Sequence, residues 1–213
     1  MKAFDFNTIE NFDEHINLSI PDYGYMIEHV INFSSYFIKQ NSSYYDIGCS
    51  TGVLLNRIKE KNKHILFKSV GIDKSENLAN THKDIIVTDI NKFEFNECDF
   101  ITIIFTLQFL KYEERKKLLI KLYNVLQING AVIICEKFLL KDGFFQDLFT
   151  FSYYDYKSIN FTEQEIMRKQ FDLRYIMTPI SEKENLKLFQ EVGFTKVESF
   201  WQSLQFKGWL LIK

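Results

Sequence analysis

Residues 43–52, which read Ser-Tyr-Tyr-Asp-Ile-Gly-Cys-Ser-Thr-Gly, constrain the fold of this 213-residue chain more than any other segment. A short run typical of a buried strand ends at Asp46 and breaks into a loop that contains Gly48 and Gly52. An apolar-periodic helix begins directly afterwards at Val53. Glycines after a first parallel strand leave the backbone bare for a ligand, and the next helix presents its N-terminus at the same place. The segment therefore predicts a strand–loop–helix unit of an α/β sheet, with a ligand at the strand tip.

The spacing within this loop discriminates between two kinds of ligand. A dinucleotide fingerprint reads G-x-G-x-x-G and brings the backbone close to a pyrophosphate. Here the small residues are Gly48, Cys49 and Gly52, and Asp46 precedes the first glycine by two positions. An acid so close would serve a phosphate poorly, whereas it would attract a sulfonium cofactor that carries an α-amino group. The loop favours the sulfonium cofactor and leaves the phosphate ligand as the alternative.

Two further apolar runs, 65–73 and 84–88, also end beside an acid, since Asp73 ends the first and Asp89-Ile90 follows the second. In open α/β sheets, ligands bind outside the carboxyl ends of the strands, where an acid on the second strand meets the ribose hydroxyls. A carboxylate accepts two hydrogen bonds from a vicinal diol. Asp89 and Ile90 are placed to meet the adenine. Either aspartate alone would be better explained as a helix N-cap or a turn residue, but three strands that each end beside an acid together favour a nucleoside cofactor.

Strands and helices alternate along the rest of the chain. The near-continuous apolar run over 99–106 is typical of a central parallel strand that is covered on both faces. The order of elements predicts a seven-stranded, mostly parallel sheet with an antiparallel last strand. After the first three strands, the expected elements are a strand over 99–106, a helix over 112–127, a turn at 129–130, a strand over 131–136, a helix over 184–192 and two strands around Glu198 and Trp209.

Composition and charge exclude several classes of protein. The net charge of −2 gives no long-range field for a polyanion, so direct nucleic-acid binding is not expected. Three cysteines without a C-x-x-C pair argue against a disulfide framework or a zinc site, and no metal site is expected. The N-terminus lacks the apolar core of a signal peptide, and no apolar run reaches membrane-spanning length. We therefore expect a cytoplasmic protein without a membrane segment.

The chain divides into parts that form one integrated domain. Residues 1–42 are expected to form an N-terminal helical cap, with Pro21 at a helix start. Residues 43–138 and 181–213 form the α/β core, and residues 139–180 are inserted as a lid. We interpret most of the lid's many aromatic residues as packing or as an oligomer interface, with one or two lining an acceptor pocket. These residues are Phe144, Phe145, Phe149, Phe151, Tyr153, Tyr154, Tyr156 and Phe161.

The loop Asp-x-Gly-Cys-x-x-Gly over 46–52 resembles the first motif of class I methyltransferases, which are Rossmann-like enzymes that bind S-adenosylmethionine. Nearly the whole chain resembles carboxy-S-adenosylmethionine synthase, and the phrase Phe-Thr-Leu-Gln-Phe-Leu over 105–110 is the most telling match. Members of that family convert S-adenosylmethionine and prephenate to a carboxylated sulfonium used in tRNA wobble-uridine modification. The resemblance implies the class I methyltransferase fold, S-adenosylmethionine as cofactor and a homodimer. The other matching motifs are Phe4-Asp5, Phe12-Asp13, Ser19-Ile20-Pro21-Asp22-Tyr23, Glu136-Lys137-Phe138, Asp155-Tyr156-Lys157 and Glu165-Ile166.

The resemblance and the first loop together give a set of expected cofactor contacts. Asp46 and Gly52 come from the loop, and Phe105 lies near the end of the strand expected over 99–106. The contacts implied by the resemblance are Tyr23, Gly48, Cys49, Ser50, Asp73, Lys74, Asp89 and Ile90.

Three positions depart from the family pattern. The family has asparagine where this chain has Ile104, arginine where it has Gln170, and a further arginine where it has Leu18. The resemblance implies that the family's arginine, which Gln170 replaces in this chain, holds the extra carboxylate of the product. A neutral amide in its place weakens carboxylate binding by ~2 kcal/mol or more. These departures indicate that the family scaffold serves another use here.

Three functions therefore compete. In the first, the chain transfers a methyl group from S-adenosylmethionine to a small-molecule acceptor, which needs positioning more than covalent help. In the second it is a carboxy-S-adenosylmethionine synthase, and in the third a non-catalytic protein that binds S-adenosylmethionine. The catalytic residue is not identified, and a base is needed only for a protonated nucleophile. The candidates are Tyr153, Tyr154 and Asp155, with Glu136 as a further acid, while His15 and His29 are interpreted as surface or core histidines.

Overall fold

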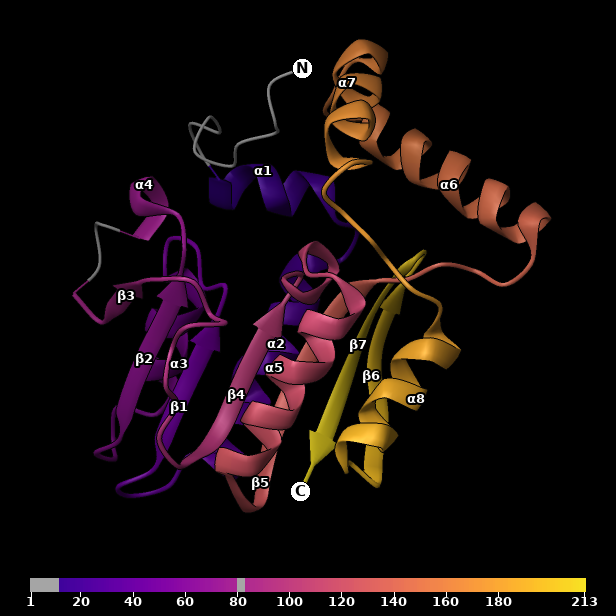
Figure 1. The fold of residues 1–213 in the computed structure, drawn as a ribbon. Coiled ribbons are helices and arrows are strands. Elements are labelled where there is room, and N and C mark those ends of the chain that lie inside the picture. The colour runs from indigo at the N-terminus through magenta and orange to yellow at the C-terminus, as the bar shows by residue number, and fades with distance from the viewer. Residues whose placement is uncertain (1–11, 80–82) are drawn as a thin grey trace.

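The computed structural model describes residues 12–79 and 83–213, and its centre is a seven-stranded sheet (Figure 1). The strand order is β3-β2-β1-β4-β5-β7-β6. Strands β1 to β5 pair in parallel, and β7 lies antiparallel between β5 and β6. This confirms the predicted mostly parallel sheet with an antiparallel last strand. The strands are β1 Ser43–Ile47, β2 Lys68–Asp73, β3 Ile85–Val87, β4 Cys98–Ile104, β5 Leu126–Lys137, β6 Lys196–Ser203 and β7 Phe206–Ile212.

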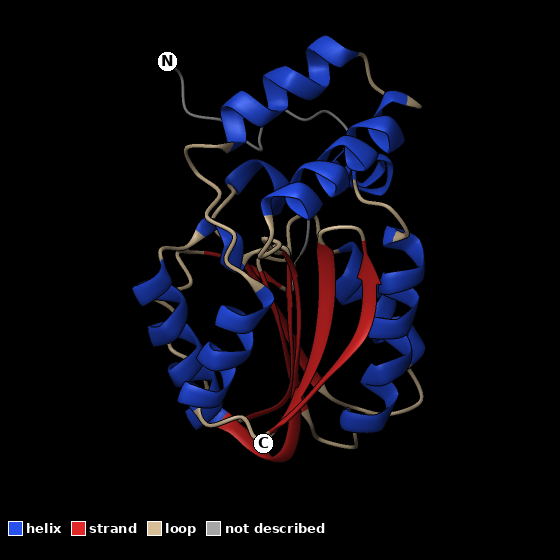
Figure 2. Ribbon diagram, turned by 90° about the vertical axis from the view of Figure 1, so that its right-hand side faces the viewer, coloured by secondary structure: helices blue, strands red, loops and turns tan. Residues whose placement is uncertain are grey.

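Helices cover both faces of the sheet, and Figure 2 shows the layers from the side. Neighbouring residues of β4 point to opposite faces, so Phe100 packs with one helical layer and Ile101 with the other. Both side chains are fully buried, as the apolar run predicted. One layer is made of α2 (Tyr23–Phe37) and α3 (Val53–Lys61), and the other of α5 (Tyr112–Val125) and α8 (Glu182–Val192), with the short α4 (Glu76–Ala79) after β2.

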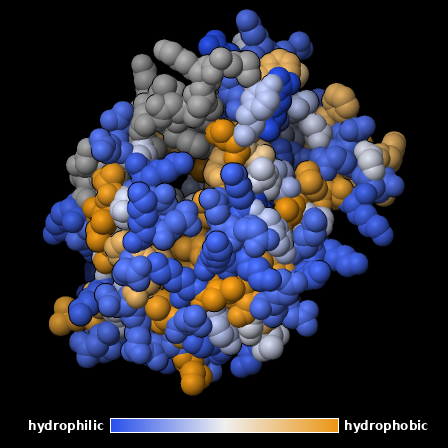
Figure 3. All heavy atoms as spheres, in the orientation of Figure 1, coloured by the Kyte–Doolittle hydropathy of each residue, from blue (hydrophilic) through white to orange (hydrophobic). Residues whose placement is uncertain are grey.

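Three helices lie beyond the carboxyl ends of the parallel strands (Figures 1 and 2). They are α1 (Phe12–Ser19), α6 (Gly143–Ser158) and α7 (Glu163–Leu173). The side chain of Asp142 accepts hydrogen bonds from the backbone N–H groups of Phe144 and Phe145 in the first turn of α6, and Thr162 and Glu165 form a capping box at the start of α7. The side chains of α6 are strongly aromatic, and Figure 3 shows apolar spheres among hydrophilic ones over this projecting region.

Helix α1 is tied to the loop after β1. The Thr51 hydroxyl donates hydrogen bonds to both carboxylate oxygens of Asp13, at 2.9 and 3.0 Å. Helix α2 instead packs on the sheet, where Met26 and Val30 are fully buried. The described part of residues 1–42 therefore contributes α2 to a helical layer on one face of the sheet, and α1 to the group of helices beyond its carboxyl edge.

The structure corrects several element boundaries. The predicted helix over 112–127 ends at Val125, and β5 begins directly at Leu126 instead of at residue 131. The strand continues through the predicted turn because Leu126 pairs with Cys98 before the register shifts. Asn129 takes the left-handed conformation at φ 64°, so the turn chemistry is present but lies within an irregular strand. The second and third strands are shorter than predicted, and the helix predicted over 184–192 begins at Glu182 after its N-cap Ser181.

Among the described residues, no helix combines the length and the apolar character needed to cross a membrane. Of the motifs that carry the family resemblance, Phe4-Asp5 lies outside the described residues.

Candidate active site

A cavity of about 1000 Å³ lies at the carboxyl edge of the sheet. Strand tips form one half of its lining, and α1, α6 and α7 contribute to the other. The structure brings ten of the eleven expected cofactor contacts to this lining, whereas Gly52 is the N-cap of α3 and is not part of it. The ten residues are Tyr23, Asp46, Gly48, Cys49, Ser50, Asp73, Lys74, Asp89, Ile90 and Phe105.

The loop after β1 requires glycine at its first position. Gly48 has φ of 70°, and a Cβ atom there would lie 2.2 Å from Thr106 Oγ1. The backbone N–H groups of Gly48 and Cys49 both donate to the carbonyl of Ile72 on β2, at 2.8 and 3.2 Å. The loop is therefore held against the neighbouring strand tip, and its small residues keep the cavity open.

Asp46 places a buried carboxylate in the cavity. Its Oδ1 atom accepts a hydrogen bond from Thr102 Oγ1 at 2.7 Å, and its Oδ2 atom has no hydrogen-bond partner among the described residues. Burial raises the pKa of Asp46 to about 7, against the Thr102 hydrogen bond, and nearby Asp73 raises it as well. An unpartnered buried carboxylate oxygen is costly unless a cation meets it. The α-ammonium group of an amino acid fits this position, which agrees with the acid that the sequence places before the glycines.

Asp73 is fixed at the tip of β2 by two backbone donors. Its Oδ2 atom accepts from the Ser50 N–H and its Oδ1 atom from the Ser75 N–H, both at 2.8 Å. An ionised carboxylate has about four acceptor positions, so each oxygen keeps one for a further donor. The arrangement therefore fits a bidentate contact to a ribose diol.

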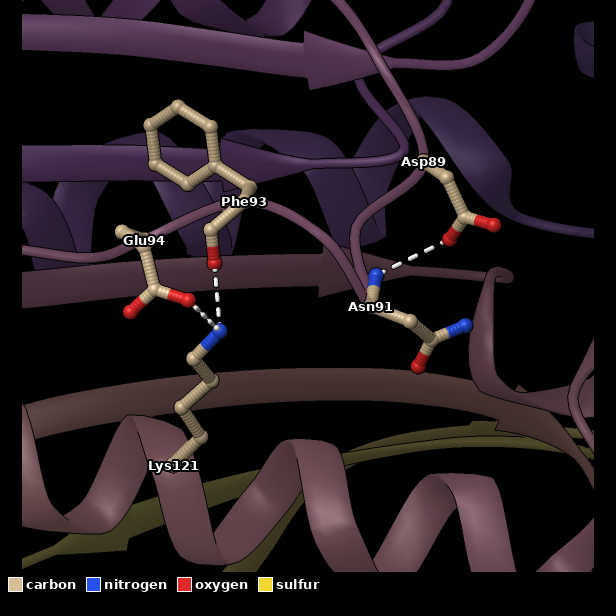
Figure 4. Close-up of polar contacts among 5 residues, drawn as sticks. All are labelled: Asp89, Asn91, Phe93, Glu94 and Lys121. Carbon is tan, nitrogen blue, oxygen red and sulfur yellow. Dashed lines mark hydrogen bonds and ion pairs between the residues drawn. The ribbon is translucent and has the colours of Figure 1, made fainter.

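Asp89 lies directly beyond the tip of β3, in a loop that is stabilised by hydrogen bonds from Asn91 and Lys121 (Figure 4). Its Oδ1 atom accepts from the Asn91 N–H at 2.9 Å. Farther along, Lys121 Nζ reaches back from α5 to the Phe93 carbonyl at 2.6 Å and to Glu94 at 3.1 Å. Ile90 is 9% exposed and presents an apolar side chain beside this carboxylate. The pair suits the edge and face of a purine ring.

Glu136 supports the loop after β4. Its carboxylate accepts hydrogen bonds from the backbone N–H groups of residues 106, 107 and 108, at 2.8 to 3.1 Å. Burial raises the pKa of Glu136 to about 8, although these hydrogen bonds and Arg115 oppose the shift. The loop begins at Phe105, which has the unusual φ of 52°. Glu136 is therefore occupied by the backbone, and the structure gives it a positioning role at the cavity edge.

The other half of the cavity is basic. Lys137, Lys157 and Lys169 line it together with His15. Burial lowers the pKa of all four side chains, and the charge of Lys157 lowers the pKa of Lys137 and Lys169, each to about 8. Burial and the two nearby lysines, Lys169 and Lys157, lower the pKa of His15 to about 4, so its imidazole is neutral at physiological pH.

Sequence reasoning missed this basic group. The sequence gives no sign that His15 is more than a surface or core histidine, but it lines the cavity and its Nε2 atom is buried without a partner among the described residues. Lys137 and Lys157 belong to motifs that carry the family resemblance, and Lys169 directly precedes Gln170. That clustering of lysines within the matched motifs was the available signal.

The catalytic candidates occupy different positions. Tyr153 is buried and lines the cavity, whereas Tyr154 is half-buried and Asp155 exposed, and neither belongs to the lining. Burial raises the pKa of Tyr153 well above its ordinary value, so its phenol is a hydrogen-bond donor at neutral pH. Two of the three departures from the family pattern, Ile104 and Gln170, also line the cavity.

Comparisons with known proteins agree with this geometry. Residues 45–134 match a family model described as "Methyltransferase domain". The carboxy-S-adenosyl-L-methionine synthase of Campylobacter jejuni is 31% identical over 99% of this chain and 93% of its own length. The corresponding synthase of Vibrio campbellii is 29% identical over 99% of this chain and 91% of its own.

Solved structures share the fold. The plantazolicin methyltransferase BpumL, solved with a desmethylplantazolicin analogue and S-adenosylhomocysteine, superimposes with a TM-score of 0.67 at 17% identity, covering 94% of this chain and 88% of its own. Human N-acetylserotonin methyltransferase in complex with S-adenosylmethionine gives a TM-score of 0.56 at 16% identity over 81% of this chain, which spans 47% of that enzyme. With relatives that are 30% identical or more over almost its full length, the chain belongs to the carboxy-S-adenosyl-L-methionine synthase family of S-adenosylmethionine-dependent enzymes with the methyltransferase fold.

Proposed function

We propose that this enzyme binds S-adenosylmethionine at the three strand tips and transfers its methyl group to a small-molecule acceptor in the basic half of the cavity. The observation that carries the proposal is the unpartnered oxygen of buried Asp46, in a cavity that also holds Asp73 and Asp89. A cofactor with an α-ammonium group, a ribose diol and an adenine presents one complementary group to each acid.

The chain's own residues provide binding and orientation. Asp46 holds the ammonium group, Asp73 the ribose hydroxyls, and Asp89 with Ile90 the adenine, while Tyr23, Lys74 and Phe105 complete the expected contacts along with the first loop. When bound, the sulfonium supplies a methyl group whose bond to sulfur breaks as its carbon bonds to a nucleophilic atom of the acceptor, with S-adenosylhomocysteine as the leaving product. Holding the two reactants in line supplies much of the rate.

Proton handling depends on the acceptor. A deprotonated nucleophile needs no base, and a protonated one needs a group that can take its proton. Tyr153 is a cavity residue whose raised pKa suits it to donate a hydrogen bond that orients the acceptor. Tyr154 and Asp155 stay candidates only if the acceptor reaches beyond the cavity.

Methyl transfer is tested with S-adenosylmethionine labelled in its methyl group and a panel of small acceptors. Labelled product together with S-adenosylhomocysteine supports the proposal. Tight cofactor binding without transfer to any acceptor favours the non-catalytic alternative instead.

Membership of the family favours carboxy-S-adenosylmethionine synthesis as a second candidate. The neutral side chain of Gln170 in the cavity lining weighs against it, because an amide does not replace a guanidinium group toward a carboxylate. Ile104, where the family has asparagine, also removes a polar side chain from the lining. Incubation with S-adenosylmethionine and prephenate, followed by mass spectrometry of the sulfonium, decides between the two. A mass gain equal to a carboxylate favours synthesis, and unchanged cofactor favours methyl transfer.

We further propose that the protein is a cytoplasmic homodimer that pairs through α6 and does not bind nucleic acid directly. Phe144 is 72% exposed and Phe151 is 65% exposed, and Phe145 and Leu148 lie beside them on the same helix. Exposed apolar groups on this scale are typical of an interface. Sedimentation of a Phe144→Glu, Phe151→Glu variant should show a monomer where the wild type is a dimer, and an unchanged mass would contradict the assignment of this face.

A further inference from the structure

Three lysines from separate elements meet in the basic half of the cavity. Lys137 ends β5, Lys157 lies in the last turn of α6, and Lys169 lies on α7. All three line the same cavity as the cofactor contacts. The fold therefore concentrates positive charge where the acceptor is expected.

Shared aromatic neighbours fix the arrangement of these charges. Lys137 Nζ lies 5.4 Å from the ring centroid of Tyr153, and Lys157 Nζ lies 5.7 Å from the same centroid. Lys157 Nζ also lies 5.0 Å from the ring of Phe161, which packs against His15 at 5.3 Å. Lys157 is thus the central cation, with Lys137 on one side and His15 on the other. Cation–π contacts offset only part of the cost of burying these ammonium groups.

Few carboxylates balance this charge. Among the described residues, no ion pair includes Lys137 or Lys157, although the latter is only 3% exposed. Asp172 is the acid that acts on Lys169, and it raises the pKa of that lysine against the effect of burial and of Lys157. Like charges that are buried together destabilise the fold unless an anion joins them. The arrangement therefore indicates a site that is completed by an anionic ligand.

The type of cation indicates the type of anion. Planar, bidentate recognition of a carboxylate is the task of arginine, whose family position is occupied here by Gln170. Lysines act as point charges and can approach a tetrahedral oxyanion from several sides. A phosphate monoester also carries close to two negative charges at neutral pH, which suits three ammonium groups better than a single carboxylate does.

We propose that Lys137, Lys157 and Lys169 bind the phosphate group of a phosphate monoester, and that this molecule is the small acceptor of the methyl group. The acceptor role rests on the proposed function, whereas the phosphate site does not. The neutral His15 completes the site as a hydrogen-bonding partner, and the ring of Tyr153 contacts two of its three cations.

Calorimetry on the full chain saturated with S-adenosylhomocysteine tests the site. The probes are inorganic phosphate, phenyl phosphate and, as a dicarboxylate of similar size and charge, malonate. We expect one equivalent of phenyl phosphate to bind at least tenfold more tightly than malonate, with inorganic phosphate competing for the same site. Absence of phosphate binding, or equal or tighter binding of malonate, would overturn the inference.

Variants assign the binding to the lysines. Lys157→Met should weaken phenyl phosphate binding at least tenfold, Lys157→Arg should retain most of it, and neither should change the affinity for S-adenosylhomocysteine. Lys141→Met is the matched control, because Lys141 is exposed and lies outside the cavity lining, and it should bind as the wild type does. Unchanged phosphate affinity in Lys157→Met would place the anion elsewhere and contradict the inference. Should that variant fail to fold, Lys169→Met takes its place with the same expected loss.

The two proposals fail in distinguishable ways. If S-adenosylhomocysteine does not bind, the proposed function is contradicted, and the phosphate titrations on the free chain still decide the lysine site. If S-adenosylhomocysteine binds and phosphate does not, only the lysine site is contradicted.

Discussion

The two halves of the cavity are built in opposite ways. The cofactor half consists of loops at the tips of neighbouring strands and carries the acids Asp46, Asp73 and Asp89. The basic half consists of side chains from α1, α6, α7 and the end of β5, which meet only in the folded chain. One half carries acidic side chains, of which Asp46 is buried, and the other carries lysines, of which Lys157 is buried.

This difference separates the cofactor contacts, which the sheet itself positions, from the acceptor contacts, which can vary with the surrounding helices. Strand-tip acids are positioned by the sheet itself, so a sheet of this topology provides a nucleoside site wherever the short loops permit. Helices α1, α6 and α7 lie outside the sheet, and their residues can change without disturbing the strand order. We therefore expect substitutions in the first half to affect cofactor affinity and those in the second half to affect the acceptor alone.

The largest effect is expected in the cofactor half. Asp73→Ala removes a bidentate acceptor and should weaken S-adenosylmethionine binding by about 100-fold, because hydrogen bonds to a charged group contribute about 1.5–3 kcal/mol each. Calorimetry measures the affinity, and circular dichroism checks that the fold persists. Asp147→Ala, which removes an exposed acid from α6, is the control and should bind normally. An unchanged affinity in Asp73→Ala would remove this residue from the ribose role.

A second effect is the pH dependence of cofactor binding. Since the pKa of Asp46 in the free protein is raised to about 7, its carboxyl group is protonated below that pH and cannot pair with an ammonium group. Affinity should therefore fall as the pH drops below about 7, by up to about tenfold per pH unit. Binding near neutral pH should also release a proton. In Asp46→Asn this dependence should disappear, and a wild-type affinity that does not change between pH 5.5 and 8 would contradict the assignment.

A third effect concerns residue 170 in the basic half of the cavity and the affinity for a carboxylated sulfonium. Gln170→Arg restores a guanidinium group in the cavity lining and should improve affinity for a carboxylated sulfonium by roughly tenfold. Affinity for ordinary S-adenosylmethionine should stay within a few fold of the wild-type value. Competition binding with both ligands measures the ratio, and an unchanged ratio would show that residue 170 does not face the ligand.

The smallest effect concerns stability. The folded pKa of Asp46 is above its ordinary value, so its contribution to the free energy of unfolding is lost as the pH rises from about 4 to about 7. Asp46→Asn should therefore stabilise the ligand-free chain at pH 8 by about 1 kcal/mol and give little or no gain at pH 4. Thermal unfolding at the two pH values measures the difference. A variant that is destabilised more at pH 8 than at pH 4 would contradict the account of this buried charge.

The sheet and the cofactor half could be predicted from the sequence because their signals are local. Each acid follows its own apolar run, and Gly48 follows the first strand by a single residue. Boundaries were less accurate where long-range pairing decides them. The start of β5 at Leu126 depends on its partner Cys98, which lies 28 positions earlier, and no local signal shows that a strand continues through Asn129.

The basic half could not be predicted because its residues are far apart in the chain. His15 precedes Lys157 by more than a hundred positions, and only the folded chain brings them to the same aromatic ring of Phe161. A lysine in a sequence is ordinarily a solvated charge, so burial rather than residue type distinguishes these three. Tyr154 and Asp155 lie outside the cavity lining for a different reason, since the helical phase of α6 turns Tyr153 inward and Asp155 outward.

The most direct measurement is a calorimetric comparison of two nucleotide ligands at pH 8. The account predicts that the purified chain binds one equivalent of S-adenosylmethionine and does not bind NAD⁺, because the carboxylate of Asp46 in the cavity lining would repel a pyrophosphate. Binding of NAD⁺ in preference to S-adenosylmethionine, or binding of neither by a correctly folded chain, would contradict it.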